Sequence, residues 1–222
     1  WATAEAEFAR ALTLDPTHVS ALQWRSINLY FPMGRLADDV ADAERARMLD
    51  PLSQVVGMTA ALVRVVSGDV EGGMALFDEL IAADPAFGMV HFFHSMALNR
   101  VGRAADAKSS VERAIALTGG SSEMVSLHAQ AKAAVGDAAG ALADVAALEA
   151  RRLERYTPAA MIAKVYIALG RHDYAMEWLR TAHREREVDL VYLMAKDSYA
   201  PLRGRADFTD LVRAVGLEPA RG

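Results

Sequence analysis

Histidine spacing is the feature of this sequence that comes nearest to a metal site. His91 and His94 stand three residues apart, and His128 follows His94 by 34 residues. Histidine pairs bind zinc, but a zinc site needs three or four ligands, and no carboxylate stands evidently beside these histidines. A core histidine is the commoner outcome at such positions, while His172 and His183 are expected at the surface. We therefore expect no metal and no cofactor.

Other catalytic patterns are also missing. The glycine pairs at residues 72–73 and 119–120 lack the Lys-Ser/Thr that follows in a phosphate-binding loop. The serine pairs at residues 109–110 and 121–122 have no histidine base at a recognisable spacing. The serines before Glu123 are instead expected to cap a helix. The protein is predicted not to be an enzyme.

Composition narrows the class of partner. The 222 residues carry a formal net charge of −5 without a basic run, which disfavours nucleic-acid binding. Without cysteine there are no disulfides or thiolate metal sites, and no apolar run reaches the roughly 20 residues that span a bilayer. No signal peptide leads the chain, and it begins at Trp1 within an amphipathic pattern. We expect a piece of a longer protein in the cytoplasm, or in the periplasm if that protein is membrane-anchored.

A 34-residue repeat organises the chain. Glycine recurs at this spacing without slippage, and each glycine is followed by Arg or Asp: Gly34, Gly68, Gly102, Gly136 and Gly170. Small residues dominate seven positions before and five positions after these glycines. Asp-Pro pairs recur near the same period, at residues 15–16, 50–51 and 84–85, and the glycine pair at 119–120 takes their place in the next unit. The pattern indicates an internal repeat rather than a single globular core.

Each repeat is predicted to be a pair of antiparallel helices. The glycine ends the first helix in a left-handed conformation, and the small residues let the two helices cross closely. The Asp-Pro pair ends the second helix, because proline lacks the amide donor and restricts the residue before it. One pair cannot bury its own apolar face, so consecutive pairs must stack. Helix-breaking glycine and proline residues at this regular spacing argue against the alternative of an alanine-rich coiled coil.

The repeat resembles the tetratricopeptide repeat. Tyr30 and Tyr166 match the aromatic of its first helix, and Phe8 and Phe77 match that of its second. The resemblance implies an all-α, right-handed α-α superhelix of about five and a half repeats over residues 1–187. Two residues depart from the pattern in the hairpin that turns at Gly34. Asp39 replaces a small residue there and Pro32 lies near the end of the first helix, so looser packing is expected.

Residues 188–222 depart from the repeat and are predicted to form a helical cap on the last pair. A short helix is expected from Asp189, and a second one at residues 208–214 with Asp207 as its N-cap and Gly216 as its stop. Gly204 falls on the repeat spacing, but its neighbours do not fit, so it is expected to be a coincidence.

The end of the chain carries a second resemblance. Its motifs are similar to those of C-terminal repeat regions of bacterial regulators: Tyr156-Thr157-Pro158, Ala168-Leu169-Gly170, Trp178-Leu179, Val191-Tyr192-Leu193, Pro201-Leu202-Arg203, Asp207-Phe208 and the run at 211–217. In such proteins a winged-helix DNA-binding domain, a Ser/Thr kinase or a nucleotide cyclase precedes the repeats. The resemblance implies a signalling or transcriptional regulator.

The first helices are expected to line a concave groove that binds a protein or peptide partner. The predicted lining is apolar in its N-terminal half and comprises Trp24, Asn28, Phe31, Met58, Leu62, Val65, Phe92, Met96, Asn99, Ser126, Gln130 and Lys164. Such a face suits a helix or an extended apolar peptide. A clamp for an acidic peptide terminus is disfavoured, because Trp24 stands at a position where that clamp needs lysine.

The predicted function is a non-catalytic protein-interaction scaffold that does not insert into membranes. Two alternatives of other classes stay open. The same apolar lining suits a sensor that holds a metabolite or lipid. Repeat arrays also pair end to end, so self-association as a homo-oligomer is the third hypothesis.

Overall fold

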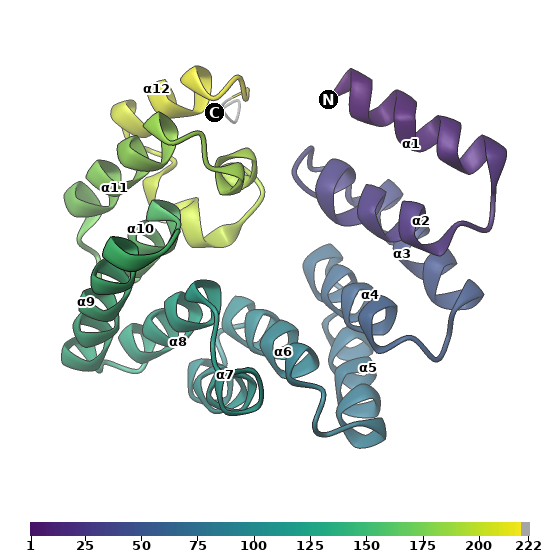
Figure 1. Ribbon diagram of the computed structural model, residues 1–222, viewed down its shortest axis with the longest axis horizontal. Helices are drawn as coiled ribbons and strands as arrows, with labels where there is room; N and C mark the ends of the chain where they lie inside the picture. The colour runs from purple at the N-terminus through teal and green to yellow at the C-terminus, as the bar shows by residue number, and fades with distance from the viewer. Residues whose placement is uncertain (219–222) are drawn as a thin grey trace. The chain divides into compact units, whose positions relative to one another are not determined.

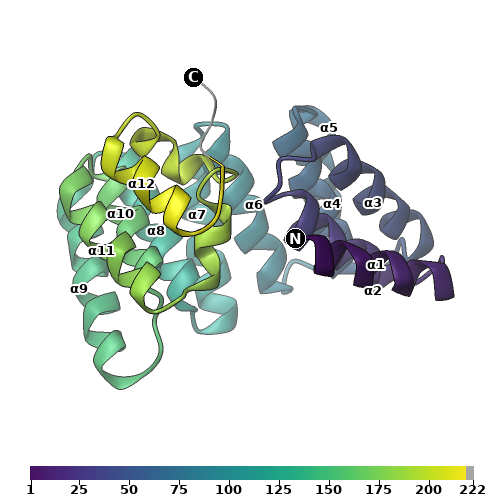
Figure 2. The same ribbon diagram turned by 90° about the horizontal axis from the view of Figure 1, so that it is seen from above.

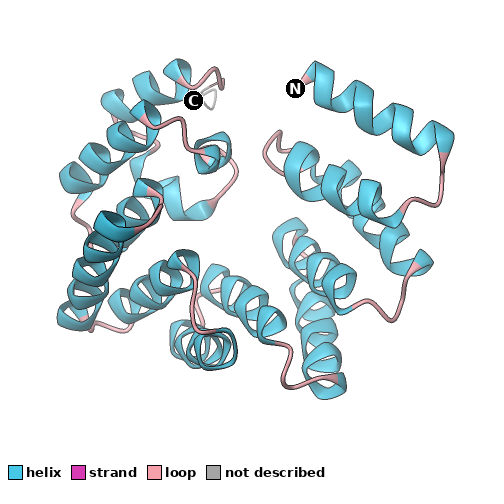
Figure 3. Ribbon diagram, viewed as in Figure 1, coloured by secondary structure: helices cyan, strands magenta, loops and turns pink. Residues whose placement is uncertain are grey.

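A computed structural model describes residues 1–218, and every regular element among them is a helix (Figure 3). Residues 219–222, the end of the predicted cap, lie outside the described residues. Within the described part, no helix combines the length and the apolar character that crossing a membrane requires. The chain divides into two compact units, Trp1–Ala97 and Leu98–Gly222, with the boundary inside one helix.

The first unit consists of helices that follow one another along the chain as antiparallel neighbours (Figure 1). They are α1 (Ala2–Leu14), α2 (Val19–Arg25), the π-helix η1 (Ser26–Tyr30), α3 (Leu36–Leu49), α4 (Gln54–Ser67), α5 (Val70–Ala83) and α6 (Gly88–Arg100), whose last residues belong to the second unit. The helix α1 packs on α2 and stands where the sequence predicts the second helix of an incomplete repeat.

The second unit continues the same alternation and ends in short segments beside α10 and α11 (Figure 2). Its elements are α7 (Ala104–Thr118), α8 (Ser122–Ala134), α9 (Ala138–Glu154), α10 (Ala159–Ala168), α11 (His172–Arg184), the 3₁₀ helices η2 (Val188–Tyr192) and η3 (Asp197–Leu202), and α12 (Ala206–Ala214). We refer to residues 188–218 as the C-terminal segment.

The turns confirm the repeat. All five glycines of the 34-residue spacing adopt a left-handed backbone, from φ +70° at Gly34 to φ +107° at Gly68. Gly204 does not, which agrees with its interpretation as a coincidence. Asp15, Asp50 and Asp84 are the C-caps of α1, α3 and α5, so each Asp-Pro pair does end a second helix.

Small residues lie where paired helices cross. A Cβ atom added to Gly73 would lie 2.7 Å from the carbonyl oxygen of Ala61, so these two backbones are in direct contact. Ala129, Ala141 and Ala163 are fully buried. Close approach of the helices therefore depends on the small side chains that the sequence pattern singles out.

Two local features differ from a regular repeat. In the hairpin with the unusual Asp39, the first helix does not stay α-helical but ends in the π-helix η1. The prediction that Asp207 caps the last helix is wrong, because α12 begins at Ala206, two residues before the predicted start, and its N-cap is Arg205. The Asp207 carboxylate lies in the first turn and accepts hydrogen bonds from Arg205 and Arg180.

Candidate functional site

The first unit exposes part of its first-helix surface. Trp24 and Asn28, one turn apart along α2 and η1, are exposed, and Phe31 is partly exposed. The Gln23 amide joins this helix to α4 by donating to the Val55 carbonyl oxygen at 3.2 Å and to the Thr59 hydroxyl at 2.9 Å. We call the surface formed by Trp24, Asn28, Phe31 and Val55 the Trp24 face.

Val55 belongs to this surface although it was not among the predicted residues. Its side chain is 43% exposed, at the start of α4. It stands 34 residues after Ala21 and three residues before the predicted Met58, so it repeats the first-helix stripe one turn earlier. Extending the predicted stripe by one helical turn would have found it.

Other predicted residues of the first unit are buried or, like Phe31, partly exposed. Met58, Val65 and Phe92 are at most 5% exposed, while Leu62 and Met96 are intermediate. The predicted Asn99, also intermediate, belongs to the second unit. Among the residues predicted to line the first unit, Trp24 and Asn28 are therefore the exposed ones.

The cation that follows Trp24 in the sequence is paired with an acid of α3. The Arg25 guanidinium makes two hydrogen bonds to the Asp42 carboxylate, at 2.5 and 2.8 Å. These hydrogen bonds raise the pKa of Arg25, and they direct its charge towards α3. The face thus lacks the lysine-rich pattern that would hold an acidic peptide terminus.

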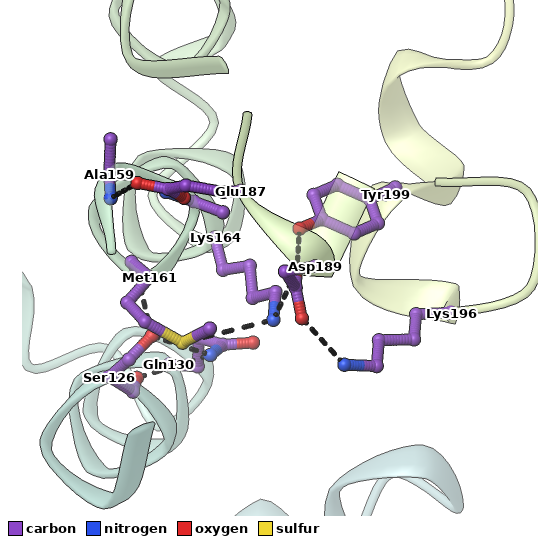
Figure 4. Close-up of polar contacts among 10 residues, drawn as sticks. Ser126, Gln130, Ala159, Met161, Lys164, Glu187, Asp189, Lys196 and Tyr199 are labelled. Carbon is purple, nitrogen blue, oxygen red and sulfur yellow. Dashed lines mark hydrogen bonds and ion pairs between the residues drawn. The ribbon is translucent and has the colours of Figure 1, made fainter. Parts of the chain in front are cut away.

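In the second unit the corresponding residues are covered. Gln130 and Lys164, both predicted to line the groove, are buried, and so is Ser126. The Ser126 hydroxyl donates to the Met161 carbonyl oxygen at 2.6 Å, and the Gln130 amide donates to the Ser126 carbonyl oxygen at 3.2 Å (Figure 4). The Ser126 bond joins α8 to α10, whereas the Gln130 bond lies within α8.

The C-terminal segment covers Lys164 with a network of charges. The Asp189 carboxylate lies 2.8 Å from the Lys164 ammonium and 2.7 Å from that of Lys196, and it accepts a hydrogen bond from the Tyr199 hydroxyl (Figure 4). Asp197 pairs with Arg100 at the end of α6. Two carboxylates of the segment are thus bound by two cations of first helices.

Burial and pairing shift these groups in opposite directions. Burial alone raises the pKa of Asp189, but the two ammonium groups outweigh it and leave that pKa below its ordinary value. Burial lowers the pKa of Lys164 and raises that of Tyr199 well above its ordinary value. The arrangement favours an ionised Asp189 and a neutral Tyr199. These charge states suit a network that stabilises the fold.

An apolar core fixes the C-terminal segment in place. Leu193, Tyr199 and Leu202 are completely buried, and they pack with residues of α10 and α11. The Glu187 carboxylate accepts hydrogen bonds from the Ala159 and Ala160 amides, at 2.5 and 3.0 Å, and so caps α10. Burying several large side chains stabilises such a segment by several kcal/mol, at roughly 1.5–3 kcal/mol each, so it is an integral part of the unit.

His91 is buried and His94 packs against an aromatic ring, as expected of core histidines, whereas His128 has acidic neighbours that the sequence did not reveal. The His128 ring lies 3.2 Å from Glu112 on α7 and 3.1 Å from Asp144 on α9, although no carboxylate was evident beside it in the sequence. His94 stacks against Phe77, with 5.2 Å between ring centroids. Within residues 1–218 no group of three or more His, Asp or Glu side chains is arranged to hold a metal ion. His128 connects three helices of one repeat and its neighbour.

Comparison with known proteins identifies the fold. No protein-family model matches the chain, and no curated protein sequence matches it. Among solved structures, it is similar to the crystal structure of a tetratricopeptide repeat protein from Parabacteroides merdae, with a TM-score of 0.64 at 15% sequence identity. The alignment covers 94% of this chain and 75% of the other. The prediction of an all-α fold of tetratricopeptide type is confirmed, and at this identity the likeness concerns the fold alone.

Proposed function

We propose that this chain is a non-catalytic protein-interaction scaffold that binds a partner peptide on the Trp24 face of its first unit. The observation that carries the proposal is the exposure of Trp24, 54% accessible on a first helix of a fold built from repeated hairpins. An exposed tryptophan is a candidate anchor for a partner, because tryptophan is enriched among the residues that dominate binding energy at interfaces. In the second unit the corresponding residues Gln130 and Lys164 are buried, so the first unit offers the more accessible surface.

The chemistry of the face suggests an apolar partner. Trp24, Phe31 and Val55 supply apolar area, Asn28 supplies an amide, and Arg25 is paired with Asp42. An uncharged segment, such as the apolar side of an amphipathic helix, fits this surface better than an acidic peptide end. Of the other predicted residues of the first unit, Met58, Val65 and Phe92 are buried, and Leu62 and Met96 are partly exposed.

We also propose the wider setting that the sequence motifs imply. Residues 1–187 would form the repeat region and residues 188–222 its cap, within a bacterial signalling or transcriptional regulator. The support for this setting is the resemblance of the motifs between Tyr156 and Leu217 to the C-terminal repeat regions of such regulators. The cytoplasm is the proposed compartment.

A peptide-display selection tests the proposed face. A library of apolar and amphipathic 15-residue peptides is selected against the chain, and the enriched peptides are titrated against Trp24→Ala, Asn28→Ala and Trp1→Ala. Trp1 is the matched control, since it is an exposed tryptophan outside the Trp24 face. We expect Trp24→Ala to weaken binding at least tenfold, about 1.4 kcal/mol, because aromatic anchors dominate such interfaces. Equal affinities of the Trp24 and Trp1 variants would refute the proposed face.

A further inference from the structure

Asp39 is a buried acid at a position that the repeat reserves for small residues. Its side chain is fully buried in α3, against the first helix of the same hairpin. The Ser26 hydroxyl donates a hydrogen bond to one carboxylate oxygen, Oδ1. The other oxygen, Oδ2, is buried and has no hydrogen-bond partner among the described residues. An ionised carboxylate in this position is only half satisfied.

The charged groups of the neighbouring elements do not compensate Asp39. On α2, Arg25 is paired with Asp42 at 2.5 Å, and on α4, Arg64 is paired with Glu44 at 2.6 Å. Arg35, which precedes α3, binds Glu5 of α1 at 2.5 Å and Asp38 at 2.7 Å. Tyr30 of η1 receives the guanidinium groups of Arg25 and Arg35 over its ring. Each cation near this crossing is therefore directed to another group.

Burial consequently favours the protonated acid. Desolvation, with a smaller contribution from the negative charge of Asp42, raises the pKa of Asp39 to about 6, although the Ser26 hydrogen bond acts in the opposite direction. Protonation removes the buried charge and turns one carboxylate oxygen into a hydroxyl donor.

The partner of Asp39 begins the irregular turn of the first helix. Ser26 is the first residue of the π-helix η1, and its carbonyl oxygen accepts from the Phe31 amide at 3.0 Å, five residues later. Insertions of this kind occur frequently at functional sites. Trp24 lies two residues before Ser26, and Asn28 lies within η1. The buried acid therefore touches the backbone segment that carries both exposed residues.

We propose that Asp39 is a proton-controlled packing residue: its protonation tightens the hairpin of α2, η1 and α3, and its ionisation loosens the segment that carries Trp24 and Asn28. An effect on partner binding would follow only if the proposed function is correct. The packing effect is independent of any partner.

The direction of the pH effect follows from linkage. An unfolded aspartate has a pKa of 3.8, whereas the folded pKa of Asp39 is about 6, so the folded hairpin binds the proton more tightly. The contribution of Asp39 to its stability is greatest below about pH 4, falls as the pH rises through this window, and stays low above about pH 6. This direction is opposite to that of an ordinary ion-paired carboxylate.

Amide hydrogen exchange tests the proposal. Exchange rates in α2, η1 and α3 are compared between the natural chain and Asp39→Asn at the same pH, because the intrinsic pH dependence of exchange then cancels. At each pH the exchange rate of the natural chain is divided by that of the variant. Where local opening is at equilibrium, we expect this ratio to rise on the order of 20-fold between pH 4.5 and 7.5. Asp38→Asn, which removes a neighbouring exposed carboxylate, is the matched control and should show a constant ratio.

If the ratio of exchange rates between the natural chain and Asp39→Asn does not change with pH, the proposal is overturned. If this variant does not fold, the titration of the Asp39 carboxyl carbon in the natural chain decides by NMR. A midpoint near pH 6 supports the proposal, and a midpoint in the ordinary aspartate range overturns it. Since neither measurement uses a partner, failure here is distinguishable from failure of the peptide selection.

Discussion

The ammonium of Lys164 on α10 and the carboxylate of Asp189 on η2 form a buried ion pair at 2.8 Å. The two residues are joined by the whole of α11, yet they meet beneath Tyr199 and beside Lys196 (Figure 4). This ion pair connects α10, which is the first helix of the last repeat, to the C-terminal segment, which lies outside the repeat. It also explains why a lysine on the predicted groove stripe is not available to a partner.

Removing Asp189 is expected to cost more stability than removing Lys164. Asp189→Asn leaves two buried ammonium groups, on Lys164 and Lys196, facing a neutral amide. Lys164→Met leaves Asp189 still paired with Lys196. We expect a loss of about 3–5 kcal/mol for Asp189→Asn and a smaller loss for Lys164→Met, measured by denaturant unfolding of the second unit. Asp210→Asn, in an exposed pair with Arg213, should change stability by less than about 1 kcal/mol. Similar losses for all three variants would contradict this account.

Acid should destabilise the second unit through the same carboxylate. The folded pKa of Asp189 lies below its unfolded value of 3.8, so its contribution to stability is complete above that value and is lost as the pH falls. We expect thermal unfolding of the natural chain to become easier in acid, and Asp189→Asn to show a flatter profile. Parallel profiles would mean that other carboxylates govern acid unfolding.

The helix crossing at Ala163 should not accept a larger side chain. Ala163 is fully buried on α10, whereas Ala168 on the same helix is exposed. We expect Ala163→Leu to destabilise the fold by roughly 1–3 kcal/mol through overpacking, and Ala168→Leu to be nearly neutral. Thermal denaturation followed by circular dichroism compares the two. A neutral Ala163→Leu would show that the helices do not cross closely at this point.

The turn at Gly68 should require glycine for conformational reasons alone. Gly68 has φ +107°, and a Cβ atom added there would meet no atom within 4 Å, so only backbone strain opposes a side chain. We expect Gly68→Ala to cost about 1–2 kcal/mol. Gly204 also has open space but no left-handed backbone, so Gly204→Ala should cost much less. Equal stabilities of the two variants would exclude strain at the turn.

Much of the fold could be predicted from the sequence because its determinants are local. Gly34, Gly68 and the glycines that continue their spacing determine the turns by their backbone freedom, and the Asp-Pro pairs end second helices for steric reasons. Buried Ala129 and Ala163 followed from the same spacing. Such preferences act within a few residues, so a single sequence displays them.

The candidate site depended on contacts between distant segments. The sequence placed Trp24 and Asn28 on a first helix, but it could not show that Lys164 is buried, because Lys164 is paired with Asp189 of the C-terminal segment. Neither could it show that His128 meets Glu112 and Asp144. Residue spacing determined the helical hairpins of this protein. Only tertiary structure, through ion pairs and apolar burial between residues far apart in the chain, decided which parts of their surfaces stay open.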